Sequence, residues 1–164
     1  MTAVVLFALN LPLVRVLSIS NRKNFSERIY SRDGAAGFVI NYTHSVNKGR
    51  VHDFYAPSGG DLLLYKTEFV SYGAGMPELA ETEGAVFRVI DGTYEISNIN
   101  RRLPSLVMAV GVIAEHSICI GSDFKSENER FLKDFFAPQT SLVFEIKRVS
   151  LAGYFFCNKN LDTN

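Results

Sequence analysis

Short alternations of apolar and polar residues run through most of the chain and predict β-strands. The clearest covers residues 142–149, where Leu142, Phe144 and Ile146 alternate with Val143, Glu145 and Lys147. Because successive side chains of a strand point to opposite faces, this pattern predicts a strand with one wet face. Further strands are predicted over residues 13–19, 38–44, 51–55, 62–72, 85–90 and 93–96.

Turn residues separate these stretches. Asp91-Gly92 stands between two strand-like runs, which is the pattern of a tight β-hairpin, since the turn needs positive φ. The sequence Gly-Ala-Gly-Met-Pro at residues 73–77 predicts a bend that no regular element accommodates. Residues 106–120 are apolar with Gly111 in the middle, so they form either two strands or one strand broken by a bulge.

One helix is predicted, over residues 127–136. Ser126 and Glu129 have the spacing of a capping box, and Phe131, Leu132, Phe135 and Phe136 fall on one face at helical period. The whole pattern predicts an all-β fold, either a β-sandwich or a barrel-like antiparallel sheet, with one short C-terminal helix.

The N-terminal residues differ from the rest, because the first fourteen carry no charge and residues 3–9 are strongly apolar. The run is shorter than a membrane span and has the length of a signal-peptide core. We interpret residues 1–10 as a truncated signal or anchor segment, with a buried first strand as the alternative. Residues 11–157 are then a single β domain, and residues 158–164 are a tail.

Composition excludes few functions. Seventeen basic residues balance seventeen acidic ones over 164 residues, so no positive field is available for a nucleic-acid partner. The two cysteines, Cys119 and Cys157, are either buried thiols or, in an exported protein, one disulfide. The sequence contains no phosphate-binding loop, nucleophile elbow, His-Glu-x-x-His or Cys-x-x-Cys motif, and we expect no cofactor and no metal.

A set of polar residues and glycines remains as the candidate ligand- or partner-binding site: His44, Ser45, Asp53, Glu68, Ser71, Tyr72, Gly73 and Gly75. His44 shares a predicted strand face with Phe38, Ile40 and Tyr42, so a hydrogen-bonded core histidine is the simpler interpretation. The backbone amides of the glycine bend are able to bind anions. A metal site of His44, Asp53 and His116, or a hydrolase that uses His44 with a carboxylate, is a further alternative.

Two segments resemble those of a known family. Residues 42–46, Tyr-Thr-His-Ser-Val, and residues 67–77, Thr-Glu-Phe-Val-Ser-Tyr-Gly-Ala-Gly-Met-Pro, are similar to the hallmark segments of domain of unknown function 1850. The resemblance covers residues 11–122 and includes Val51, Asp53 and His116. It departs from the family at Gly49 and Arg50, where Pro is common, and at Asp53, where Glu is common.

The resemblance implies a small bacterial, extracytoplasmic protein with an N-terminal signal or anchor, often encoded beside tripartite ATP-independent periplasmic transporters. It implies no established activity. We therefore expect an accessory or binding module whose partners are membrane transporter subunits, with no nucleic acid and with the small-molecule ligand unknown. The alternatives are a structural domain without a ligand site and a metal-dependent hydrolase that uses a His–carboxylate pair.

Overall fold

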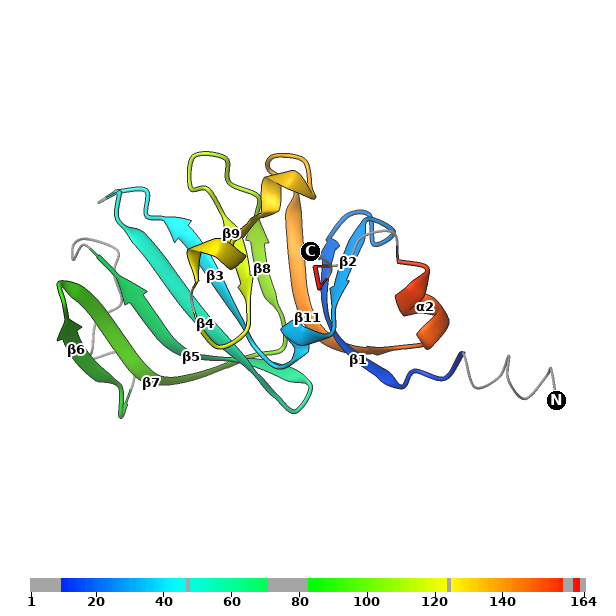
Figure 1. Ribbon diagram of the computed structural model, residues 1–164, viewed down its shortest axis with the longest axis horizontal. Coiled ribbons are helices and arrows are strands. Elements are labelled where there is room, and N and C mark those ends of the chain that lie inside the picture. The colour runs from blue at the N-terminus through cyan, green and yellow to red at the C-terminus, as the bar shows by residue number, and fades with distance from the viewer. Residues whose placement is uncertain (1–9, 47, 71–82, 124, 158–160, 163–164) are drawn as a thin grey trace.

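The computed structural model of the chain describes residues 10–46, 48–70, 83–123, 125–157 and 161–162. Two antiparallel sheets pack face to face, as in a β-sandwich, and the strands described do not close into a barrel (Figure 1). The predicted all-β class is confirmed, and of the two predicted architectures, β-sandwich or barrel-like sheet, the structure shows the sandwich.

The smaller sheet has four strands in the order β2-β1-β11-β8. Its strands are β1 (Val14–Asn21), β2 (Arg28–Ser31), β8 (Leu106–Ala109) and β11 (Ser141–Val149). The predicted alternation of β11 is confirmed, because Leu142 and Phe144 are fully buried in the core while the side chain of Lys147 is 43% exposed. The 3₁₀ helix η1 (Asp33–Ala35) follows β2, and helix α2 (Leu151–Phe155) follows β11.

The larger sheet has seven strands in the order β10-β9-β3-β4-β5-β7-β6. Its strands are β3 (Phe38–Thr43), β4 (Arg50–Ser58), β5 (Asp61–Phe69), β6 (Val86–Ile90), β7 (Thr93–Leu103), β9 (Ser117–Ile120) and β10 (Arg130–Phe131). The predicted hairpin is present: Asp91 and Gly92 connect β6 to β7 with φ of 50° and 79°.

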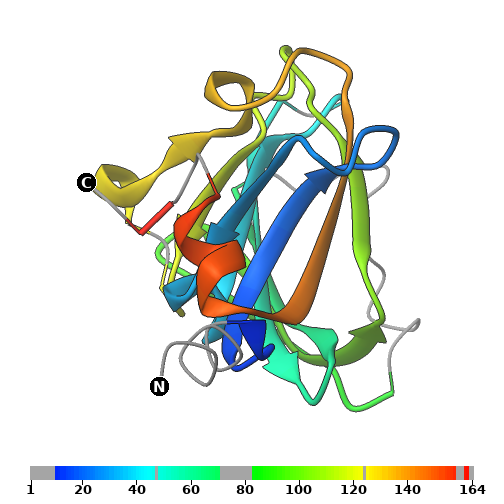
Figure 2. The ribbon, with the colours of Figure 1, turned by 90° about the vertical axis from the view of Figure 1, so that its right-hand side faces the viewer.

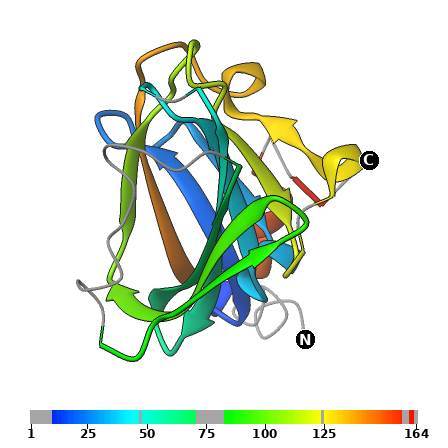
Figure 3. The same cartoon turned by 90° about the vertical axis from the view of Figure 1, so that its left-hand side faces the viewer.

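The core lies in two main parts. The larger apolar cluster joins the two sheets through residues such as Leu17, Phe38 and Phe144, and the rings of Phe38 and Phe144 stack at 6.2 Å. The second cluster contains Val51, Phe69, Ile96 and Ile99, all from the seven-stranded sheet. Figure 1 shows that β6 and β7 lie at the end of the larger sheet farthest from β1 and β2, and Figure 3 looks directly onto this end. The end of the larger sheet that carries β6 and β7 therefore lies beyond the region where the two sheets pack together.

The predicted helix over residues 127–136 is wrong. This segment forms the 3₁₀ helix η3 (Ser126–Asn128), then β10, then the 3₁₀ helix η4 (Leu132–Asp134). Two tertiary contacts override the helical pattern: Arg130 and Phe131 pair with Ile118 and Ser117 of β9, and Leu132 is buried in the core. The one α-helix of the described residues is α2, further along the chain, where Ser150 caps Gly153 N at 3.0 Å.

Residues 106–120 are two strands, and these strands belong to different sheets. β8 pairs with β11 in the smaller sheet, whereas β9 pairs with β3 and β10 in the larger one. The connection between them turns at Glu115, which has φ of 49°, and the backbone N–H of Gly111 donates to His116 Nδ1 at 2.9 Å. The chain thus passes from one sheet to the other at this point.

Most of the proposed N-terminal signal or anchor, and most of the proposed tail, lie outside the described residues. Among the residues that are described, no helix is long and apolar enough to cross a membrane. Cys119 and Cys157 do not form a disulfide: the Cys119 thiol lies 3.6 Å from the carbonyl oxygen of Lys125, and that of Cys157 lies 3.6 Å from the carbonyl oxygen of Arg28.

The turn after β2 leaves no room for a side chain at Gly34. A Cβ atom there would lie 2.8 Å from Ser31 Oγ and 3.0 Å from Leu17 Cδ2. We expect Gly34→Ala to lower the free energy of unfolding by about 1–3 kcal/mol through overpacking, measured by urea denaturation. Gly60→Ala is the matched control, because nothing lies within 4 Å of a Cβ atom at that turn. Equal stability of the two variants would contradict the prediction.

Candidate binding surface of the seven-stranded sheet

The pairing register of the larger sheet aligns polar residues across it. Residues directly opposite one another in neighbouring strands share a face of the sheet. Six residues, one from each of six adjacent strands, are aligned in this way, and we call them the polar row: Ser117, Asn41, His52, Glu68, Glu95 and Arg88. Ile40 and Tyr42 pack in the core on either side of Asn41, so the polar row lies on the sheet face turned away from the smaller sheet.

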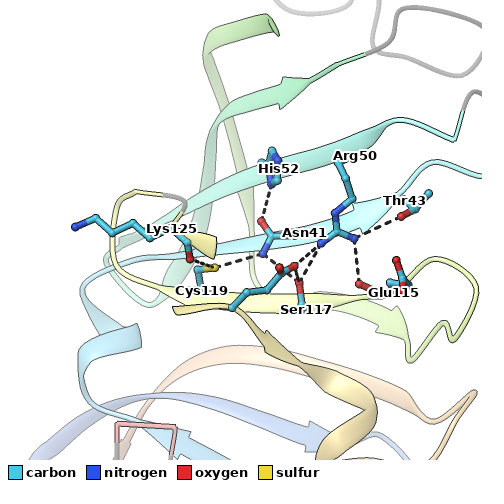
Figure 4. A network of polar contacts seen from close by, with 9 residues as sticks. Asn41, Thr43, Arg50, His52, Glu115, Ser117, Cys119 and Lys125 are labelled. Carbon is cyan, nitrogen blue, oxygen red and sulfur yellow. Dashed lines mark hydrogen bonds and ion pairs between the residues drawn. The ribbon is translucent and has the colours of Figure 1, made fainter. Parts of the chain in front are cut away.

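Asn41 is the centre of the buried end of the polar row. Its amide Nδ2 donates to Ser117 Oγ at 3.2 Å and contacts Cys119 Sγ at 3.5 Å, and its Oδ1 lies 2.8 Å from His52 Nδ1 (Figure 4). Asn41 and Ser117 are both fully buried. Since an amide oxygen only accepts, Nδ1 of His52 carries a proton. One side chain therefore links β3, β4 and β9.

An ion pair completes this network at the start of β4. The Arg50 guanidinium pairs with the Glu129 carboxylate, which also accepts a hydrogen bond from Ser117 Oγ. Arg50 further donates to the carbonyl oxygen of Glu115 at 3.2 Å and to Thr43 Oγ1 at 3.5 Å (Figure 4). The side chains of Arg50 and Glu129 are 28% and 15% exposed, so the pair is only partly screened by water.

Two titratable groups of this network, His52 and Cys119, have pKa values shifted in favour of their neutral forms. Burial, and then the positive charge of Arg50, lower the pKa of His52 below its usual value. Burial raises the pKa of the Cys119 thiol. A thiol needs a lowered pKa to act as a nucleophile near neutral pH. The network is therefore suited to hydrogen bonding and not to nucleophilic attack.

The other end of the polar row is charged and more open. Lys66 Nζ lies 2.7 Å from Glu68 Oε1 and 4.0 Å from Glu95 Oε2, and it sits 3.9 Å from the centre of the Phe54 ring. Glu68 and Glu95 are directly opposite each other on β5 and β7, and one lysine lies between the two carboxylates. This arrangement leaves acceptor oxygens for a cationic or hydrogen-bonding partner.

Asp53 lies on the opposite, inner face of the same sheet. Thr67 Oγ1 donates to Asp53 Oδ1 at 2.7 Å, and the Tyr42 hydroxyl also hydrogen-bonds to this carboxylate. Burial raises the pKa of Asp53 to about 6. Tyr42 packs against both apolar clusters, which places Asp53 between them. A buried carboxylate that titrates near neutral pH is a feature of functional sites as well as of structural networks.

Four of the predicted site residues, His44, Ser45, Asp53 and Glu68, are described by the structure, and these four do not share one face of the sheet. His44 and Ser45 lie in the turn after β3, where His44 Nδ1 accepts from the backbone N–H of Val46 at 3.3 Å. Asp53 and Glu68 are on opposite faces of the larger sheet. Ser71, Tyr72, Gly73 and Gly75 lie outside the described residues. A binding role for these residues stays a prediction.

Sequence reasoning missed the residues that form the buried network. Asn41, Arg50, Ser117 and Glu129 come from four distant positions, and Glu129 was assigned to a helix cap. One signal was available: Asn41 interrupts an apolar strand, and a buried polar side chain needs hydrogen-bond partners. Among the described residues, no group of three or more His, Cys, Asp or Glu side chains is arranged to hold a metal ion.

The raised pKa of Asp53 predicts a pH-dependent stability. A carboxylate whose pKa is raised from 3.8 to about 6 by folding stabilises the protein below pH 4, and this contribution is lost as the pH rises through 6. We compare the free energy of unfolding of Asp53→Asn with that of the original protein. The difference, variant minus original, should increase by about 3 kcal/mol between about pH 4 and pH 7. Urea denaturation at a series of pH values measures it.

Asp123→Asn controls for the loss of one charge, because Asp123 is exposed in the loop after β9. A difference between Asp53→Asn and the original protein that is the same at every pH would contradict the prediction.

The buried network predicts a large cost for removing its centre. Asn41→Ala leaves Ser117 and the Nδ1–H of His52 without their amide partner inside the fold. We expect the free energy of unfolding to fall by about 2–4 kcal/mol, measured by denaturant titration. Asn128→Ala, at an exposed asparagine of η3, is the control and should change stability little. A similar small effect at both positions would show that the network contributes no stability.

Comparison with known proteins gives one result. No curated protein and no solved structure matches the chain significantly. The family described as domain of unknown function (DUF1850) matches residues 38–125, which is more than half of the chain. The matched segment runs from the start of β3 to residue 125, just before η3, and contains all six residues of the polar row. The chain therefore belongs to the DUF1850 family of domains of unknown function.

Proposed function

We propose that this DUF1850 protein is a non-enzymatic, extracytoplasmic binding module that docks a subunit of a bacterial membrane transporter through the polar row. One observation carries the proposal: polar and charged side chains are aligned in register across six strands of the larger sheet. Its half-buried carboxylates, Glu68 and Glu95, both lie within 4.0 Å of Lys66 Nζ, which holds them in position and limits the ordering cost of binding.

The chemistry of the site favours binding over catalysis. The Nδ1–H of His52 donates a hydrogen bond to the amide oxygen of Asn41, and the Cys119 thiol has a raised pKa. The ion pair of Arg50 and Glu129 holds both side chains in place. This buried network fixes the strands, and the open end of the polar row, Glu68, Glu95 and Arg88, presents charged donors and acceptors to a partner. The uncharged N-terminal residues and the transporter setting implied by the resemblance support a partner at the membrane.

Charge reversal on the polar row tests the proposal. Glu68→Arg replaces an acceptor carboxylate of the polar row by a cation next to Lys66, and a cation that faces a cationic group of the partner costs several kcal/mol. We expect it to reduce recovery of a transporter subunit from native membranes, by affinity pull-down and mass spectrometry, by at least about tenfold.

The smaller sheet offers a matched control. Glu145 pairs with Lys147 two residues along β11, as Glu68 pairs with Lys66 on β5. Glu145→Arg should leave recovery unchanged, with circular dichroism confirming that both variants fold. Equal recovery of the transporter subunit with both variants would show that the polar row is not the contact surface. Recovery of no membrane protein with the original or with either variant would contradict the accessory role.

A further inference from the structure

The Asp53 carboxyl lies on the inner face of the larger sheet without a charged partner. Asp53 stands directly opposite Ile40 of β3 and Thr67 of β5. Figure 2 shows the molecule from the side of α2 and the smaller sheet, with the larger sheet behind them. The hydroxyls of Thr67 and Tyr42 hydrogen-bond to the carboxylate, and in the part of the chain that the structure describes no ion pair includes Asp53. Two neutral donors therefore have to satisfy this carboxylate.

The titratable groups that face Asp53 do not compensate its charge. Tyr42 projects from β3 and Tyr55 from β4, and burial raises the pKa of both hydroxyls, so they stay neutral. Arg101 of β7 stands opposite Leu64, and its positive charge acts on Tyr55. Ionisation of Asp53 therefore places an unpaired negative charge between the two apolar clusters, which costs free energy.

The pairing of β4 with β5 ties Asp53 to the polar row on the opposite face. Thr67, its partner, stands between Lys66 and Glu68 on β5, and these two neighbours point to the outer face. Lys66 Nζ lies 2.7 Å from Glu68 Oε1 and 3.9 Å from the centre of the Phe54 ring. Because adjacent pairs of a ladder share one backbone, a change in the spacing of Asp53 and Thr67 also moves the groups at the open end of the polar row.

The ladder is irregular on both sides of this part of β5. The pairing of β4 with β5 shifts in register between Phe54 and Tyr55, and that of β5 with β7 shifts between Leu64 and Lys66. A bulge interrupts the ladder of hydrogen bonds, so fewer bonds oppose a local opening there than within an unbroken ladder. The pair of Asp53 and Thr67 thus lies at a place where the sheet opens at low cost.

We propose that the pair of Asp53 and Thr67 is a pH-sensitive joint of the larger sheet. With the Asp53 carboxyl neutral, the joint is closed and holds the open end of the polar row in place. Ionisation of Asp53 loosens the joint and that end with it. Burial raises the pKa of Asp53 to about 6, so the change falls near neutral pH. This inference rests on the proposed function in one respect, because it makes docking through the polar row stronger on the acidic side of that pH.

NMR of the isotope-labelled full chain tests the joint without a partner. The Asp53 carboxyl carbon should titrate with a midpoint near pH 6. Over the same range the backbone amides of Lys66 and Glu68 should shift and lose protection against hydrogen exchange, after correction for the intrinsic exchange rate. Asp53→Asn should abolish these changes, and Asp123→Asn, in the exposed loop after β9, should retain them. Amides that respond equally in Asp53→Asn, or that do not respond in the original protein, would overturn the proposal.

A second variant tests whether the hydrogen bond from Thr67 belongs to the joint. The Thr67 hydroxyl favours the ionised carboxylate, and valine keeps the shape of threonine without that donor. Thr67→Val should therefore raise the midpoint of the Asp53 titration by about one pH unit. His52 titrates in all of these proteins, so a difference between variants belongs to Asp53. An unchanged midpoint in Thr67→Val would show that this pair is not the joint.

Docking at two pH values tests the link to the proposed function. In pull-downs from native membranes, the original protein should recover at least about fivefold more transporter subunit at about pH 5 than at about pH 7.5. Asp53→Asn should recover equal amounts at both. Equal recovery by the original protein would contradict control of docking by the joint. Recovery of no membrane protein at either pH would contradict the proposed function alone, and the NMR titration would still decide whether the joint exists.

Discussion

The buried amide of Asn41 is the contact on which the larger sheet depends. It joins β3 to β9 through Ser117 and to β4 through His52, and both Asn41 and Ser117 are fully buried while His52 is half-buried. A shift of one residue in either pairing would turn Asn41 into the apolar core and expose Ile40 or Tyr42. The amide therefore specifies the register, and the register in turn aligns the polar row.

Local sequence signals predicted the parts of the fold that depend on local geometry. Asp91-Gly92 encodes its hairpin because the tight turn itself requires positive φ, and β11 is recognised because its alternation matches one buried and one wet face. The segment 127–136 failed because its phenylalanines are placed by contacts with β9 and the core, which helical periodicity cannot represent. β2, with four residues, is too short to carry a pattern.

The candidate site was harder to predict than the fold for a related reason. Asp53 and Glu68 were grouped because they lie on consecutive predicted strands, but the face of each residue depends on the register of β4 against β5. The pairing of β4 with β5 also shifts in register between Phe54 and Tyr55, and no residue pattern in the sequence predicts this shift. The family match shows that the region from β3 to η3 is shared, and it contains both Asp53 and the polar row.

Leu161 and Asp162, the last residues that the structure describes, also affect which edges of the smaller sheet are open to other molecules. The backbone N–H of Leu161 donates to the carbonyl oxygen of Tyr30 at 3.3 Å, and the Leu161 side chain is buried in the core. Asp162 then accepts from Ser31 and Arg32 at the end of β2. The outer edge of β2 is thus occupied by the protein's own backbone, which protects the smaller sheet against strand addition and edge-to-edge aggregation on that side.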